Sequence, residues 1–135
     1  MLALEITQLN KNYKSFSLND VSFQLEQGYI MGFIGANGAG KTTTLKSILN
    51  MIHIDSGDIN ILGKNFIEHE LELKQTIGYA FGGIDYYTRS TVKKVTNVVK
   101  SFYSNWNEDT YHHYIKKFNL DENKKIIELS AGMKV

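Results

Sequence analysis

Residues 35–42 have the composition and spacing of a loop that binds phosphate. They read Gly-Ala-Asn-Gly-Ala-Gly-Lys-Thr and match the pattern G-x-x-x-x-G-K-[ST]. Small side chains let successive backbone N–H groups curl around an anion. Lys41 should reach the β- and γ-phosphates of a nucleotide and act catalytically by stabilising charge. Thr42 should bind Mg²⁺ through its hydroxyl, and Thr43 could bind the α-phosphate. The loop therefore predicts a nucleoside triphosphate site.

The segments on either side of the loop have the order that such a site needs. Residues 29–34 are a short apolar run, which predicts a strand buried on both faces. A helical period follows from Thr42 to about Asn50, with Leu45, Ile48 and Leu49 on one face. A helix N-terminus presents unpaired N–H groups and a positive dipole end to an anion. This order favours a phosphate loop over a glycine turn that precedes a helix by chance. It does not choose among a transporter ATPase, a GTPase and a kinase.

The rest of the chain divides into an extended part and a helical part. Alternating or apolar runs predict strands at 2–7, 16–25 (interrupted at Asn19-Asp20), 57–62 and 76–81, with a short helix at 68–74. Two helices follow, with Thr91 and Asn107 as N-caps and a stripe of Tyr111, Tyr114, Ile115 and Phe118 on the second. Trp106 and Tyr111 have the spacing of a hydrophobic staple. We therefore predict two domains, 1–81 and 82–135.

Composition excludes several other classes of protein. The 135 residues carry a formal net charge of +1 and no cysteine. With so small a net charge, no overall electrostatic field favours binding to nucleic acid or to an anionic membrane. The absence of cysteine excludes disulfide frameworks and cysteine-ligated metal sites. No apolar run approaches the roughly 18 residues that a membrane span needs. The early acid Glu5 argues against a signal peptide. A cytoplasmic chain that does not bind nucleic acid is expected.

Two competing classes of phosphate-loop protein lack their own motifs here. A GTPase should contain Asn/Thr-Lys-x-Asp, but the nearest string, at 123–126, is Asn-Lys-Lys-Ile and has no acid in its last place. A small kinase should have an arginine-rich lid, but Arg89 is the single arginine of the chain. The sequence therefore offers no support for either of these two classes.

A second motif, near residue 130, resembles the signature of ATP-binding-cassette (ABC) transporter ATPases. Leu129, Ser130, Ala131, Gly132 and Met133 are similar to the usual Leu-Ser-Gly-Gly-Gln. In that family the segment opens a helix whose N-terminus faces the γ-phosphate of ATP held by the opposite subunit. The resemblance implies that the Ser130 hydroxyl donates a hydrogen bond to this ATP. It also implies that Gly132 lets the ATP approach the backbone closely. Ala131 and Met133 depart from the usual residues.

The resemblance extends over essentially the whole chain. Tyr13 is similar to the aromatic residue that stacks on adenine, and Asp55-Ser56-Gly57-Asp58-Ile59 to the turn after the phosphate-loop helix. Phe102-Tyr103 with Trp106-Asn107 resembles subunits of antimicrobial-peptide and small-peptide exporters. The implied nucleotide-binding residues are Tyr13, Gly35, Ala36, Asn37, Gly38, Ala39, Gly40, Lys41, Thr42 and Thr43.

The resemblance also implies a fold, cofactors and partners. The fold is α/β, a partial P-loop NTPase of the ABC type, with an N-terminal β-subdomain and phosphate-loop core followed by a helical subdomain. The cofactors are ATP and Mg²⁺. The partners are a membrane-spanning transporter subunit and a second ATP-binding subunit. With the second ATP-binding subunit this chain would form a homodimer or heterodimer on the cytoplasmic face of a membrane.

Two departures from the family pattern bear on activity. The usual glutamine after Ile77-Gly78-Tyr79 is replaced by Gly82, so either coupling is altered or Asp85 substitutes for it. The family's magnesium-supporting Asp, catalytic Glu and switch His would all follow the signature, and the C-terminal part of the core sheet is missing. We therefore expect this chain to bind nucleotide with little or no hydrolysis. We also expect it to self-associate, because an absent strand leaves a sheet edge exposed.

One alternative function stays open. The chain could be a non-catalytic nucleotide-binding or interaction module from a truncated or split ABC protein. An ATPase parent should continue into an apolar strand that ends in Asp-Glu, whereas such a module should not.

Overall fold

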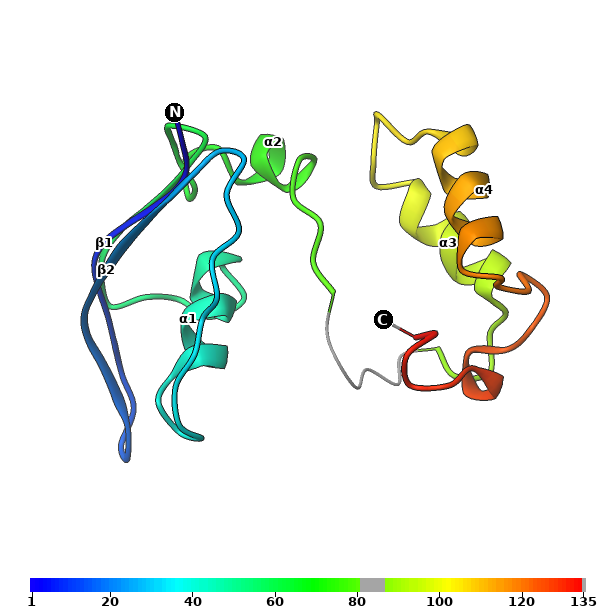
Figure 1. Ribbon diagram of the computed structural model, residues 1–135. Coiled ribbons are helices and arrows are strands. Elements are labelled where there is room, and N and C mark those ends of the chain that lie inside the picture. The colour runs from blue at the N-terminus through cyan, green and yellow to red at the C-terminus, as the bar shows by residue number, and fades with distance from the viewer. Residues whose placement is uncertain (81–86, 135) are drawn as a thin grey trace. The chain divides into compact units, whose positions relative to one another are not determined.

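The computed structural model describes residues 1–80 and 87–134. They belong to two compact units, Met1–Leu73 (unit 1) and Lys74–Val135 (unit 2), drawn in Figure 1. The boundary predicted after residue 81 falls in the segment 81–86, outside the described residues. The predictions for Gly82 and Asp85 lie outside them as well.

Unit 1 contains an antiparallel sheet whose strand order is β2-β1-β3-β4. The strands are β1 (Leu2–Asn12), β2 (Ser17–Glu26), β3 (Ser56–Ile61) and β4 (Lys64–Asn65). β1 is the central member of the first three and places Ile6 opposite both Phe23 and Ile59. These apolar pairs share one face, as the period of two in each strand requires.

The hairpin of β1 and β2 is irregular at the residues that predicted an interruption. Asp20 has a left-handed φ of 51°, and its backbone N–H donates to Asn10 Oδ1 at 2.9 Å. β2 nevertheless continues through this position, so the turn residues make a bulge and not a break. On the other side of β1, Gly57 has a φ of 100°, and a Cβ there would overlap the backbone of Gln8. Glycine at 57 therefore lets β3 approach β1.

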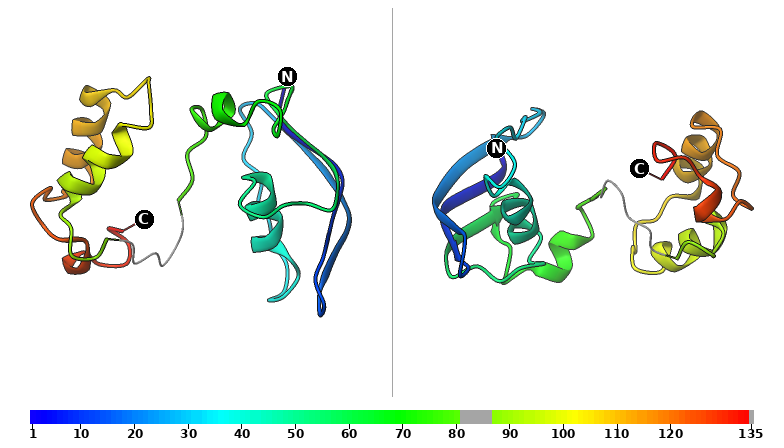
Figure 2. Two further views of the ribbon diagram at one scale, coloured as in Figure 1. Left: turned by 180° about the vertical axis from the view of Figure 1, so that it is seen from behind. Right: turned by 90° about the horizontal axis from the view of Figure 1, so that it is seen from below.

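Helix α1 (Lys41–Ile48) lies on one side of this sheet (Figures 1 and 2). Its buried residues include Thr44 and Ile48, whereas Leu45, predicted on the same face, is 40% exposed. Asn50, with a φ of 52°, ends the helical conformation. The helix therefore forms where the periodicity predicted it, one residue earlier than Thr42.

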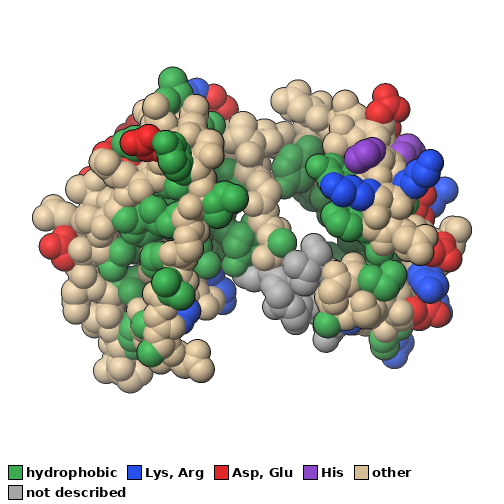
Figure 3. Space-filling view, viewed as in Figure 1, with side chains coloured by type: hydrophobic (Ala, Val, Ile, Leu, Met, Phe, Trp, Pro, Cys, Tyr) green, Lys and Arg blue, Asp and Glu red, His purple; other side chains and the backbone are tan. Residues whose placement is uncertain are grey.

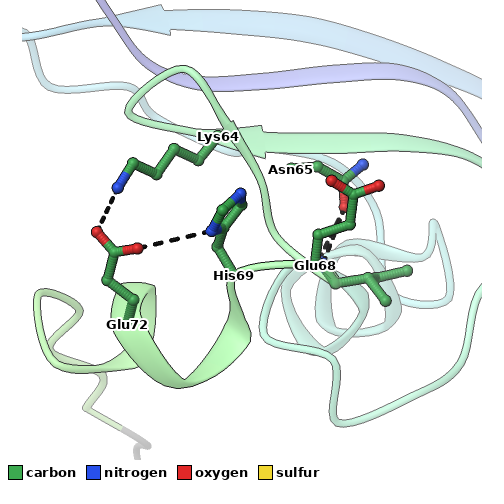
Figure 4. A network of polar contacts seen from close by, with 6 residues as sticks. Lys64, Asn65, Glu68, His69 and Glu72 are labelled. Carbon is green, nitrogen blue, oxygen red and sulfur yellow. Dashed lines mark hydrogen bonds and ion pairs between the residues drawn. The ribbon is translucent and has the colours of Figure 1, made fainter.

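A short helix, α2 (Glu70–Lys74), follows β4 and is preceded by a polar network (Figure 4). The side-chain carbonyl of Asn65 accepts a hydrogen bond from the backbone N–H of Glu68 at 3.2 Å. Lys64 donates to Glu72 on α2, and this bond holds the pKa of the Glu72 carboxyl below its ordinary value. The network fixes the direction of the chain as it leaves the sheet.

Unit 2 contains α3 (Val92–Lys100), α4 (Glu108–Lys117) and the 3₁₀ turn η1 (Ile126–Glu128). Both predicted N-caps are confirmed, since Thr91 Oγ1 accepts from the Lys94 N–H at 3.3 Å and Asn107 Oδ1 accepts from the Thr110 N–H at 2.8 Å. The described residues contain no helix that is long and apolar enough to cross a bilayer.

The side chains around α4 confirm one prediction and correct another. The predicted staple is present, because the rings of Trp106 and Tyr111 lie 5.4 Å apart. The predicted buried stripe is wrong at Tyr114 and Phe118, which are 47% and 60% exposed and stack on each other at 5.9 Å. Two short helices that pack together cover only the part of each helix that contacts the other, so the remaining side chains stay exposed.

Two predicted strands are not strands in the structure. Residues 29–34 are irregular, with Ile30 and Ile34 exposed at 100% and 95%. Within the described residues no strand runs beside this segment, so no ladder of hydrogen bonds can form there. Residues 76–80 are irregular as well, and Phe81 lies outside the described residues. Figure 3 shows hydrophobic side chains on the surface of unit 1. The exposed hydrophobic residues of this unit include Ile30 and Ile34.

Candidate nucleotide-binding site

The glycine loop turns sharply at two of its glycines before α1 begins. Gly38 and Gly40 have φ values of 84° and 91°, in the region that favours glycine. Between them, the backbone N–H of Ala39 donates to the carbonyl of Ala36 at 3.2 Å. The loop thus closes on itself through its own backbone.

Gly40 is constrained by the sheet as well as by its own conformation. A Cβ at this position would overlap Leu18 and would lie 2.8 Å from Cζ of Phe16. The β1–β2 hairpin therefore packs directly against the start of α1, and only glycine leaves room for it. This contact fixes the glycine loop relative to the sheet.

The first turn of α1 has no side-chain cap. Gly40 occupies the N-cap position and supplies no hydrogen-bonding side chain, and the first turn contains no acidic residue. The N–H groups at a helix start have no partners within the helix, and the dipole there favours negative charge. The start of α1 is therefore chemically suited to an anion such as phosphate.

Lys41 lies over the carbonyl groups at the beginning of the loop. Its Nζ donates to the Gly35 carbonyl at 2.6 Å and to the Ala36 carbonyl at 2.8 Å. The ammonium is thereby held beside the loop, at the same end of α1 as the uncapped amides. A phosphate at this end would meet a positive side chain and several N–H donors together.

A cavity of about 510 Å³ opens at this end of the helix. It is lined by Ser15, Phe16, Asn37, Gly38, Gly40, Lys41, Thr42 and Thr43. Six of these belong to the predicted nucleotide-binding set, whereas Gly35, Ala36 and Ala39 form the loop without lining the cavity. The lining includes one cation and no carboxylate. Its volume is within the range of pockets that hold small molecules and cofactors.

The predicted adenine-stacking residue does not line this cavity. Tyr13 is 45% exposed, and its ring lies 6.4 Å from that of Phe16. Its backbone N–H donates to the Phe16 carbonyl at 2.8 Å, and Lys11 Nζ lies 5.5 Å from its ring. Ser15 and Phe16, which sequence reasoning missed, line the cavity in its place. The signal available in the sequence was an aromatic residue three positions after Tyr13 in the same hairpin turn.

The signature residues lie in unit 2 and form a hydrogen-bonded turn, not a helix. Ser130 Oγ accepts from the Met133 N–H at 3.3 Å, and its carbonyl accepts from the Lys134 N–H at 3.2 Å. Leu129 is buried, while Ala131 and Gly132 are exposed. Ser130 thus opens this turn, and the two small residues after it are accessible.

The residues at the cavity fit Mg²⁺ bound together with a nucleotide. Among the described residues, no cluster of three or more His, Asp or Glu side chains could hold a metal ion on its own. Mg²⁺ usually keeps several waters and takes its remaining ligands from phosphates and a few side chains. The exposed hydroxyl of Thr42, in the first turn of α1, would be its ligand from this loop.

The chain matches a known protein family and is similar to several known proteins. The family described as "ABC transporter" matches residues 18–135. The ABC transporter ATP-binding protein YtrB of Bacillus subtilis (strain 168) is 33% identical over 132 residues, which are 97% of this chain and 45% of that protein. The bacitracin transport ATP-binding protein BcrA of Bacillus licheniformis is 31% identical over 134 residues, 97% of this chain and 44% of that protein. The chain therefore spans less than half the length of these relatives.

Solved structures are similar to the chain over nearly all of its residues. A structure described as the ATP-binding subunit of an ABC transporter superimposes with a TM-score of 0.84 at 25% identity, covering 98% of this chain and 57% of that one. A putative ABC transporter ATP-binding protein from Pyrococcus furiosus gives 0.76 at 28% identity, covering 97% and 64%. Both the fold and the glycine loop agree with the family match, and the chain belongs to the ATP-binding subunits of ABC transporters.

Proposed function

We propose that this chain binds Mg-ATP at the cavity at the start of α1. The observation that carries the proposal is the uncapped N-terminus of α1, which opens beside Lys41 into a cavity lined without any carboxylate. An anion there meets free N–H donors, the positive helix end and an ammonium group. No acidic group in the lining opposes it.

Each residue of the loop has a distinct role in this proposal. Lys41 exchanges its bonds to the Gly35 and Ala36 carbonyls for the β- and γ-phosphates. Thr42 contacts Mg²⁺ and Thr43 contacts the α-phosphate. When the metal is bound, it neutralises charge on the phosphate oxygens. Lys41 and the loop amides stabilise the same charge, which is the catalytic role expected of Lys41.

Hydrolysis by this chain should be slow or absent. An attacking water must be oriented, and its proton must be accepted by a suitable group. The cavity lining contains hydroxyl, amide, ammonium and phenyl groups, but no carboxylate and no histidine. Binding without turnover is therefore the expected behaviour of these 135 residues. The same observation supports a second candidate, a non-catalytic nucleotide-binding or interaction module.

We propose partners for this chain on the basis of the family to which it belongs. The likeness to ATP-binding subunits supports a membrane-spanning subunit and a second ATP-binding subunit as partners, with this chain on the cytoplasmic face of the membrane. Leu129, Ser130, Ala131, Gly132 and Met133 would then contact ATP held by that second subunit, with the Ser130 hydroxyl as donor. Residues 102–107 resemble subunits of peptide exporters, and the similarity to a protein named for bacitracin transport supports a related transport role.

Self-association of the isolated chain is a further part of this proposal. Ile30 and Ile34 are exposed at 100% and 95%, so residues 29–34 present an apolar segment that association would bury. Sedimentation at rising concentration tests this expectation. A monomer that persists at high concentration would rule it out.

A binding titration tests the nucleotide site. Mg-ATP is titrated into the chain and into Lys41→Ala by isothermal calorimetry. We expect binding in the first, and a loss of at least about tenfold in affinity in the second, because a charge-assisted contact worth roughly 1.5–3 kcal/mol is removed. Phosphate release is measured on the same samples and should stay at background.

The matched control for this titration is Lys46→Ala. Lys46 is in the last turn of the same helix and does not line the cavity. Its removal should leave affinity unchanged. Equal loss in both variants would indicate a nonspecific charge effect, and no binding by the parent chain would contradict the proposed function.

A further inference from the structure

In unit 2, the segment that leads from α4 to the signature residues returns to the residues that open α3 (Figures 1 and 2). This segment, residues 122–127, and residues 88–93 are joined by backbone hydrogen bonds of 2.9–3.0 Å that run in both directions. The pairs, each with its N–H donor first, are Val92 and Lys124, Lys93 and Glu122, Ile126 and Ser90, and Ile127 and Thr88. Residues 122–127 are therefore fixed to the start of α3.

A hydroxyl group from α4 holds the beginning of this segment. The Tyr111 hydroxyl donates to Glu122 Oε1 at 2.8 Å and is also hydrogen-bonded to Thr96 Oγ1 of α3 at 3.3 Å. Tyr111 and Glu122 are both half-buried. Burial is the main cause that raises the pKa of Tyr111 above its ordinary value of 10.0, so the hydroxyl keeps its proton and can donate. Tyr111 thus ties α3, α4 and segment 122–127 together.

Further contacts connect this segment to the signature residues. Glu128 Oε2 accepts from the Lys125 N–H at 2.6 Å. The Leu129 N–H donates to the Ile126 carbonyl at 3.2 Å, and the Leu129 side chain is buried. Ser130 follows directly and opens its hydrogen-bonded turn. The direction of that turn therefore depends on where segment 122–127 is held.

We propose that Tyr111 and Glu122 are positioning residues for the signature. Their hydrogen bond holds segment 122–127 against α3 and so sets the direction in which Ser130 meets ATP on a second subunit. This inference rests on the proposed role of the signature residues. Neither side chain touches nucleotide, because both act through the segment. Their loss should weaken the contact between subunits and leave the Mg-ATP site of unit 1 unchanged.

The test separates nucleotide binding from dimerisation. Calorimetry at low chain concentration gives the affinity for Mg-ATP, and sedimentation gives the dimerisation constant with and without Mg-ATP. The ratio of these two constants isolates the effect of nucleotide from any association through residues 29–34. Tyr111→Phe removes the hydroxyl and keeps the ring that packs on Trp106.

We expect Tyr111→Phe to bind Mg-ATP with unchanged affinity and to show a ratio about tenfold smaller. A symmetric dimer uses the signature twice, and the loss of one hydrogen bond should weaken each contact by about threefold.

Variants of Glu122 show whether the bond itself matters. Glu122→Gln keeps a carbonyl oxygen that can accept from the Tyr111 hydroxyl, so it should retain most of the ratio. Glu122→Ala should lose it as Tyr111→Phe does. The two losses should not add in the double variant, because both substitutions remove the same bond.

Two controls come from the same helix. Tyr114→Phe also removes a tyrosine hydroxyl, but the exposed Tyr114 ring stacks on Phe118 at 5.9 Å, and this variant should keep the ratio. Asn107→Ala removes the cap of α4 and should lower the melting temperature without changing the ratio.

The other outcomes are distinguishable. An unchanged ratio in Tyr111→Phe overturns the inference, and so does an equal fall in Asn107→Ala, which would mean that only the stability of unit 2 matters. If the parent chain binds Mg-ATP but does not dimerise more strongly with it, the proposed role of the signature residues fails and this inference fails with it. If the parent chain does not bind Mg-ATP, the proposed nucleotide site itself fails.

Discussion

Helix α1 of unit 1 and helices α3 and α4 of unit 2 begin in different ways. α3 and α4 start at Thr91 and Asn107, whose side-chain oxygens accept backbone N–H groups of their own first turns. α1 starts at Gly40, which has no side chain to offer. Capping by a side chain stabilises a helix by about 1 kcal/mol, so α1 lacks a contribution that α3 and α4 have.

The difference separates helix starts that are closed by their own caps from one that is open to a ligand. A capped start has already satisfied part of its free N–H groups, and an anion would have to displace the cap. The start of α1 is open, has no acid in its first turn and lies beside Lys41. α4 is the reverse case, because Glu108 and Asp109 occupy its first turn. In α1 a ligand can take the place of the cap.

The largest effect should come from closing the space at Gly40. Gly40→Ala introduces a Cβ that overlaps Leu18 and nears Phe16, at a φ of 91°. Overpacking and left-handed backbone together should cost about 3 kcal/mol of unfolding free energy and most of the Mg-ATP affinity. Urea unfolding and calorimetry measure the two losses.

Gly63→Ala is the control for Gly40→Ala. Gly63 has a φ of 78°, with no atom within 4 Å of an added Cβ. It should lose only about 1–2 kcal/mol, through the backbone alone, and keep its affinity for Mg-ATP. Equal stability losses in the two variants would show that the packing of the hairpin against α1 contributes little.

The second effect is stabilisation by the ligand that replaces the cap. Mg-ATP at one hundred times its Kd should stabilise the folded state by about 2.7 kcal/mol. Hydrogen exchange should slow at residues 35–48, while the first turns of α3 and α4 keep their rates. Equal protection at all three helix starts would contradict the assignment of the open start as the site.

A smaller effect should follow from removal of the cap on α4. Asn107→Ala deletes the oxygen that accepts from the Thr110 N–H at 2.8 Å. The loss should be about 1 kcal/mol, measured as faster hydrogen exchange in α4, with Mg-ATP affinity unchanged. Asn97→Ala, at an exposed position within α3, serves as the control and should show no such loss. A change in nucleotide affinity would mean that this helix start contributes to the site.

The smallest effect concerns the carboxyl group of Glu108 in the first turn of α4. The hydrogen bond from Lys100, at 2.7 Å, is the main cause that holds the pKa of Glu108 below its ordinary value of 4.5. A carboxyl whose pKa is lowered by folding stabilises the folded state above its unfolded pKa. That contribution disappears as the pH falls through the lower, folded pKa.

Unit 2 should therefore lose stability through this carboxyl on acidification below about pH 4.5. Glu108→Gln should flatten the dependence, as measured by the melting temperature across pH 3–6. A slope that Glu108→Gln leaves unchanged would assign the acid sensitivity to other carboxyls.

Much of unit 2 and of the glycine loop could be predicted because short-range chemistry decides them. Thr91 and Asn107 bond to N–H groups three residues away. The closure of the loop, from Ala39 to Ala36, is equally local. Such interactions are present in the sequence as spacing, so the motif and the caps identified them.

The prediction was wrong where an element depends on distant partners. Residues 29–34 have a strand's composition, but a strand also needs a neighbour for its hydrogen bonds, and the described residues supply none. Tyr114 and Phe118 have helical spacing, but whether they are buried depends on what packs over α4. Periodicity indicates which side chains share a face and does not indicate what covers that face.

The sequence by itself determined the glycine loop at which we propose that phosphate binds. The order of Gly38, Gly40 and Lys41 fixes a closed loop, an uncapped helix and a cation within a few residues, whatever surrounds them. Only the tertiary structure decided that Ser15 and Phe16 line the cavity as well. Phe16 reaches the start of α1 because the β1–β2 hairpin packs against Gly40. That contact joins residues far apart in the chain, and sheet packing, not local spacing, brings them together.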